Sequence, residues 1–175
     1  MADVKSSNIP DNKIPSTMAA LAVGKDVYFS SSLKGGAFLL TPSRKPPRKA
    51  HEGTAREVAL AIERCQQAHN SEHRYGLACA EPLAVQQSLV NNQQTPIEGK
   101  AKVSTYGVLK RTKDGKIEDE GILDPCNKDR FGQWGCQIFV DKLQITKVGK
   151  QADHPDLPSF DPSKALPHCF WENPQ

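Results

Sequence analysis

Prolines confine regular secondary structure to the middle of this chain of 175 residues. Residues 41–49 contain three prolines and residues 149–175 contain five, and proline lacks the amide hydrogen that a helix or a central strand requires. We therefore expect an exposed loop at 41–49 and a Pro-rich C-terminal tail at 149–175. Residues 1–16 are expected to form a polar N-terminal extension, so that residues 17–148 are left as a single domain.

Short apolar runs bounded by turn residues predict two β-hairpins within this domain. Residues 18–22 and 27–30 flank a turn that contains Gly24, and residues 102–110 and 117–123 flank a turn at residues 113–116. A further strand is expected over residues 144–148. With the helices described next, these strands indicate an α/β domain whose sheet opens with an antiparallel hairpin.

Three helices are predicted from apolar residues at helical spacing. Thr54 and Glu57 fit a capping box, in which the two side chains bind the free amide groups at a helix start, and the apolar stripe through Cys65 continues to about residue 69. Cys65 is therefore expected to be a buried apolar side chain. A second helix is predicted from near Cys79 to residues 91–92, and a short third helix over 136–143.

Composition excludes some classes of protein. No run of about 18 apolar residues occurs and the chain begins with polar residues, so we expect neither a membrane span nor a secretory signal. The chain is expected to be cytoplasmic, or to be a domain of a larger or secreted toxin. A net charge of +3 permits a nucleic-acid partner without requiring one. Five cysteines are too few to indicate a disulfide framework and favour metal ligands, reactive thiols or buried side chains.

The positions of three cysteines predict a zinc site. Cys79 stands two residues before Glu81 at a predicted helix start, and Pro125-Cys126 precedes Cys136, which opens another predicted helix. Three thiolates bind Zn²⁺ and leave its fourth position to a water, whose pKa falls towards about 7. A helix N-terminus helps to keep a thiolate deprotonated, and a glutamate beside the ligands can carry a proton. The pattern therefore indicates hydrolytic chemistry.

The sequence Cys79-Ala80-Glu81, followed by Pro125-Cys126 and then by Cys136, resembles the signature of the zinc-dependent cytidine deaminase superfamily. The resemblance covers roughly residues 18–148. It implies a three-layer sandwich, in which a mixed sheet is flanked by helices. It also implies that Cys79, Cys126 and Cys136 bind zinc, that Glu81 is the catalytic proton carrier, and that Ala80 and Pro125 shape the substrate site.

This chain departs from the family pattern at two places. Nine residues separate Cys126 from Cys136 where the family has two, a span that costs little additional entropy to close around a metal. Residues 30–35 replace the Asn-x-Glu element with which nucleoside-type enzymes hold the ribose. The resemblance therefore implies hydrolytic removal of the amine of cytosine in single-stranded DNA or RNA. A free nucleoside or base deaminase is the first alternative.

Several side chains are candidates for binding such a substrate. Arg44 and Lys45 belong to the basic loop and could contact phosphates, whereas Phe131 and Trp134 lie in the segment between two expected ligands and could stack on an extruded base at the pocket mouth. Tyr28 and Phe29 are either stacking surfaces or parts of the core.

Other groupings of histidine and cysteine carry weaker predictions. His69 and His73 have ligand-like spacing relative to Cys65, but histidines near a helix C-terminus are more often surface residues that complement the helix dipole. The pair at 168–169 is a further source of a ligand if Cys136 is not one. A non-catalytic, zinc-stabilised binding protein is the second alternative, because it would retain the cysteines without needing Glu81.

Overall fold

The computed structural model describes residues 15–33, 39–40, 49–92, 95–114, 117–127 and 132–149. In chain order they form β1 (Thr17–Val23), β2 (Asp26–Ser31), α2 (Arg56–His69), α3 (Ala80–Asn91), β3 (Ala101–Arg111), β4 (Ile117–Leu123), α4 (Cys136–Lys142) and β5 (Thr146–Lys147). Most of the basic loop and nearly all of the Pro-rich tail lie outside the described residues. No helix in the described part of the chain is long and apolar enough to cross a membrane.

The strands form one mixed sheet in the order β2-β1-β3-β4. β1 is antiparallel to β2, with Met18 opposite Ser31, and β3 is antiparallel to both β1 and β4. β5 is parallel to β3 and pairs with its first residues. Both predicted hairpins are therefore confirmed, and the sheet opens with an antiparallel pair as expected.

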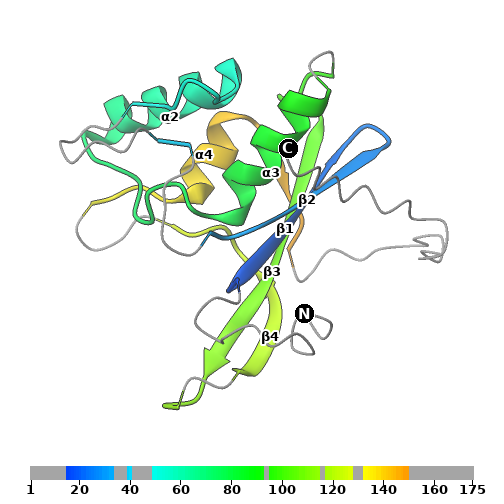
Figure 1. Ribbon diagram of the computed structural model, residues 1–175, viewed down its shortest axis with the longest axis vertical. Coiled ribbons are helices and arrows are strands. Elements are labelled where there is room, and N and C mark those ends of the chain that lie inside the picture. The colour runs from blue at the N-terminus through cyan, green and yellow to red at the C-terminus, as the bar shows by residue number, and fades with distance from the viewer. Residues whose placement is uncertain are drawn as a thin grey trace, which may run out of the picture.

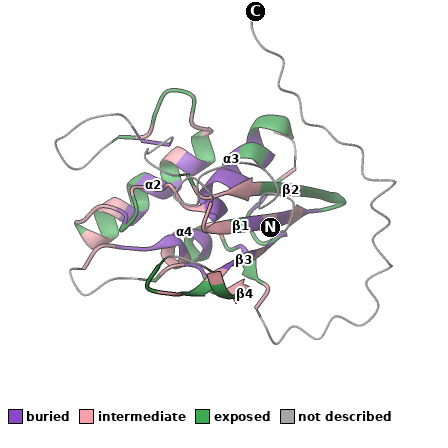
Figure 2. Ribbon diagram, turned by 60° about the horizontal axis from the view of Figure 1, so that its bottom comes forward, coloured by how far each residue is buried: buried purple, intermediate pink, exposed green. Residues whose placement is uncertain are grey.

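All three helices lie on the same side of the sheet (Figure 1), where α3 packs on β1 and β2, while α2 contacts α3 and α4 but none of the described strands. Alternate residues of the central strands β1 and β3 point into the core. The buried positions include Leu21 and Val23 of β1 and Val103 and Thr105 of β3, and their neighbours in the strands are more exposed. Figure 2 colours the strands by this burial. The described residues thus form two layers. The α/β class is confirmed, whereas the second helical layer of a three-layer sandwich does not occur among them.

The start of α2 is stabilised by contacts with other elements. The predicted capping box is wrong, because Ala55 is the N-cap residue and the Thr54 hydroxyl donates instead to the Leu39 carbonyl at 3.3 Å. The Ala55 amide donates to Oε1 of Gln86 in α3 at 2.8 Å, and Nε2 of Gln86 donates to the Gly53 carbonyl. A side chain of the neighbouring helix therefore replaces the local cap.

Truncation of a core side chain in β1 tests this packing. Leu21 is fully buried, so Leu21→Ala should lower the free energy of unfolding by about 2–5 kcal/mol through lost apolar burial and a residual cavity. Urea denaturation measures the change. Val27→Ala is the control, because Val27 of β2 is 51% exposed, and its effect should stay within about 0.5 kcal/mol. Equal effects of the two substitutions would contradict the assignment of the buried face.

Candidate metal centre

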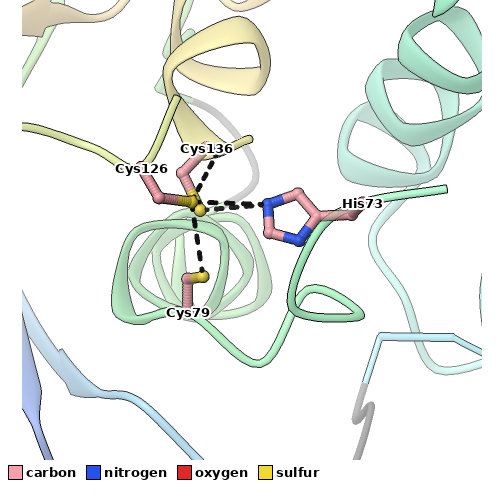
Figure 3. A group of neighbouring side chains, drawn as sticks. All are labelled: His73, Cys79, Cys126 and Cys136. Atoms are coloured by element: carbon pink, nitrogen blue, oxygen red, sulfur yellow. Dashed lines mark hydrogen bonds between the residues drawn. The ribbon is translucent and has the colours of Figure 1, made fainter. Parts of the chain in front are cut away.

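Four side chains from separate parts of the chain meet at one point (Figure 3). Cys79 is the N-cap of α3, Cys136 is the first residue of α4, Cys126 follows β4, and His73 lies in the loop between α2 and α3. One ligand atom of each lies within 4.8 Å of the others. The structure therefore brings together the three predicted cysteines and adds a histidine, in a group that could hold a metal ion.

The distances and the donor types suit zinc. The Sγ atoms of Cys79 and Cys126 are 3.9 Å apart, and Nε2 of His73 lies 3.3 Å from Sγ of Cys136 and 3.9 Å from Sγ of Cys126. Two sulfurs bound tetrahedrally to one zinc at about 2.3 Å would be separated by about 3.8 Å. A set of three soft thiolates is typical of zinc.

Cys126 is held against the start of α4 by backbone contacts. The Gln137 amide donates to the Cys126 carbonyl at 3.0 Å, and the Cys136 amide donates to Sγ of Cys126 at 3.1 Å. The approach is so close that a Cβ atom on Gly135 would lie 2.6 Å from the Asn127 carbonyl. The nine residues between Cys126 and Cys136 therefore do not prevent the two thiols from meeting.

The three thiols divide their protons unequally. Hydrogen bonds from Cys136 and Cys79 hold the pKa of Cys126 far below its ordinary value, and donors on His73 and the Cys136 backbone contribute. The pKa of Cys79 is raised, mainly through its hydrogen bond to Cys126, and burial raises the pKa of Cys136. These contacts favour the thiolate form of Cys126, and a bound dication would favour the thiolate form of all three cysteines.

Glu81 lies beside these thiols at the start of α3. Its side chain is 4% exposed, and its Oε1 accepts a hydrogen bond of 3.0 Å from the Thr105 hydroxyl of β3. Burial raises the pKa of the carboxyl, a backbone hydrogen bond opposes this, and the charge of Cys126 raises it further. A hydrogen bond with Cys136 also acts on the same carboxyl. A buried carboxyl thus borders the thiol cluster.

The prediction that His73 is a surface residue at a helix C-terminus is wrong. Helix α2 ends at His69, and His73 is 2% exposed. Its ring meets that of Trp134 edge to face, at 4.7 Å between centroids and 84° between planes. The signal for its role was its position, six residues before Cys79, and not its spacing from Cys65.

The prediction that Trp134 lies at a pocket mouth is also wrong. Its side chain is completely buried, and its indole Nε1 donates to the Ser71 carbonyl at 3.0 Å. In this position it cannot be a stacking surface at a pocket mouth. The large ring instead anchors the loop that carries His73, because a buried indole N–H needs a fixed acceptor.

Of the other residues predicted to contact a substrate, some lie outside the described residues and some are buried. Phe131, Arg44 and Lys45 lie outside the described residues. Ala80 and Pro125 are buried next to Cys79 and Cys126, and their contact with a substrate stays a prediction. Phe29 is 61% exposed on the sheet, whereas Tyr28 packs against the core.

Comparisons with models of protein families, with curated proteins and with solved structures gave no match. The chemistry of this centre is therefore inferred from the distances, burial and hydrogen bonds of its own side chains.

Replacing the cysteines one at a time tests the metal centre. The purified chain should carry about one zinc, and Cys79→Ala, Cys126→Ala and Cys136→Ala should each lose it, because two thiolates hold the ion far less tightly than three. Elemental analysis measures the content. Cys65→Ala is the matched control: Cys65 is also buried, its pKa is raised to about 11, and it lies outside the cluster. Zinc retained in a cluster variant, or lost from the control, would contradict the ligand assignment.

The close contact at Gly135 gives an independent test that leaves all four side chains unchanged. Gly135→Ala should push the Cys126 loop away from α4 and lower zinc affinity at least tenfold, a loss typical of disturbed supporting contacts. Competition with a chelator measures the affinity. Gly53→Ala is the control, because a Cβ atom there meets only Nδ1 of His51, at 3.6 Å. Unchanged affinity in Gly135→Ala would show that the loop does not set the position of Cys126.

Proposed function

We propose that this protein is a zinc-dependent hydrolytic deaminase that acts on cytosine in single-stranded nucleic acid. The observation that carries the proposal is the buried carboxyl of Glu81, two residues after Cys79 and next to the thiols of Cys126 and Cys136. A zinc site that only stabilises a fold has no use for such a group, whose burial costs free energy. Hydrolysis needs it as a proton carrier.

The proposed reaction is a hydrolysis, in which a carbon–oxygen bond replaces a carbon–nitrogen bond without oxidation or reduction. The oxygen of water forms a bond with the ring carbon that bears the exocyclic amine, and the carbon–nitrogen bond breaks. One proton of the water goes to ring nitrogen N3 and the other to the leaving amine, which departs as ammonia. Cys79, Cys126 and Cys136 would hold the zinc, which when bound would lower the pKa of a water and so activate it.

Glu81 is placed to move the proton between water and the leaving amine. The Thr105 hydroxyl donates to Oε1 and helps to orient the carboxyl, which would accept a proton from water and pass it on. The side chain is 4% exposed, so bulk water is kept away from it and the proton is passed within the site.

An exposed aromatic side chain near the cluster supports a nucleic-acid substrate. Tyr75 is 52% exposed and follows His73 by two residues, and the guanidinium carbon of Arg74 lies 4.9 Å from the centre of its ring. An aromatic ring beside a cation is the kind of surface on which single-stranded bases and phosphates bind. The absence of the Asn-x-Glu element in the sequence also argues against a free nucleoside.

A second candidate is a non-catalytic protein in which zinc only stabilises the fold. The observation that favours it is the position of His73, whose Nε2 lies near the sulfurs of Cys136 and Cys126 and could complete a closed set of four ligands. Glu81 would then have no chemical role. The two candidates therefore differ in their demand for Glu81 and in the function of His73.

Replacing Glu81 separates the two candidates. Glu81→Gln preserves the shape and an acceptor for Thr105 but cannot carry the proton, so deamination should fall by about 10²–10⁴-fold while zinc content and folding stay unchanged. Release of ammonia and formation of uracil from cytosine-containing single-stranded DNA, RNA and free cytidine measure the activity. Glu57→Gln is the control, because Glu57 is exposed in the first turn of α2.

The substrate that is turned over in this assay distinguishes the candidate functions. Turnover of an oligonucleotide by the parent chain supports the proposal, and turnover of cytidine alone supports the free-nucleoside alternative. If the zinc-loaded chain deaminates none of the three substrates, and Glu81→Gln leaves its stability unchanged, the proposal is contradicted. The zinc then has a structural role only.

A further inference from the structure

The chemical role of His73 follows from its hydrogen bonds. We infer that His73 is not a zinc ligand but a positioning residue, whose Nε2–H donates a hydrogen bond to the Cys136 thiolate and leaves the fourth position of the metal to an exchangeable ligand. The inference rests on the proposed zinc site. It decides between an open site and a closed one.

Two backbone amides donate hydrogen bonds to Nδ1, the second ring nitrogen of His73. Nδ1 of His73 accepts from the Tyr75 amide at 3.0 Å and from the Leu77 amide at 3.1 Å. Both donors are backbone N–H groups, which always carry their hydrogen. Nδ1 must therefore present its lone pair to the loop.

The tautomer follows from this arrangement. A neutral imidazole has one N–H and one lone pair, so the lone pair at Nδ1 leaves the hydrogen at Nε2. A histidine that binds zinc through Nε2 needs the lone pair there, and it usually donates its Nδ1–H to a carbonyl or a carboxylate. His73 has the opposite environment at Nδ1. Its Nε2, 3.3 Å from Sγ of Cys136, is placed as a donor to sulfur.

The loop has an unusual backbone that creates this environment. Gly76 and Leu77 both have positive φ angles, of 58° and 61°, and a buried leucine rarely adopts this conformation. This turn directs the amides of Tyr75 and Leu77 toward the same acceptor, Nδ1 of His73. Such backbone geometry persists only where surrounding contacts enforce it, and it occurs most often at functional sites.

Contacts on the other side of the ring fix its plane. The Arg74 amide donates to the Trp134 carbonyl at 2.8 Å, the Ser71 hydroxyl donates to the Gly132 carbonyl at 3.0 Å, and the indole of Trp134 meets the His73 ring edge to face. The loop from residue 71 to residue 77 is thereby tied to the chain just before α4. His73 and Cys136 consequently keep a constant separation, as a hydrogen bond between them requires.

A donor to a thiolate has a specific effect on the metal. Three thiolates and one Zn²⁺ carry a net charge of −1, and this negative charge weakens the pull of the ion on its fourth ligand. Cys126 receives a hydrogen bond from the Cys136 amide, and Cys136 receives one from His73. Both bonds withdraw charge from sulfur, so the metal polarises its remaining ligand more strongly.

The first measurement reads the tautomer directly. Long-range ¹H–¹⁵N correlation spectra of the zinc-loaded full chain should show His73 protonated at Nε2, with an Nδ1 that carries neither hydrogen nor metal. The His73 signals are identified by their loss in His73→Gln, and His51→Gln is the control, because His51 is exposed. Protonated Nδ1 together with a metal-bound Nε2 would overturn the inference.

The second measurement examines the coordination sphere. X-ray absorption at the zinc edge should show three sulfurs and one light atom, without the outer-shell scattering of an imidazole, and His73→Gln should retain this pattern. Imidazole scattering that disappears in His73→Gln would overturn the inference and leave the zinc site intact. A chain that binds no zinc would overturn the proposed function instead, and the spectra of that metal-free chain would still support or overturn the hydrogen bond through the tautomer.

Discussion

The burial of α3 is the constraint on which the rest of this structure depends. Nine of its twelve residues are buried, so this helix must be enclosed by the sheet on one side and by the other helices elsewhere. Its first residues are fixed by the same packing, which brings Cys79 to the cluster and Glu81 against Thr105 of β3. The site is therefore built on the most enclosed element, and the position of its carboxyl depends on the whole core.

The polar groups that this burial removes from water are all paired within the described residues. Glu81 has Thr105, the thiols have one another, and His73 has two backbone amides on one nitrogen and a sulfur on the other. Such a network is stabilising only when every member is satisfied. A metal ion at its centre would replace shared protons by bonds to the thiolates, so metal binding and the stability of α4 and its preceding loop are expected to be coupled.

Local patterns were sufficient for much of the fold and for part of the site. Both hairpins, the extent of α2 and the burial of Cys65 follow from the spacing of apolar residues. The predicted grouping of the three cysteines is also found. The capping box failed because Ala55 is the N-cap residue, and its amide donates to Gln86, 31 residues further along the chain. The failure at Trp134 has a similar cause, since only the fold shows which aromatic side chains are enclosed.

The sequence by itself determined which residue types are available for chemistry, namely three thiols and a carboxyl, of which Cys79, Glu81 and Cys136 fall at predicted helix starts. The tertiary structure decided how these groups are used. His73 meets Cys136 across 63 positions of sequence, and its tautomer is set by a turn at Gly76 and Leu77 whose positive φ angles no local propensity predicts. The difference is physical: helix and strand signals are properties of short segments, whereas the direction of a hydrogen bond between distant segments exists only after the core has packed.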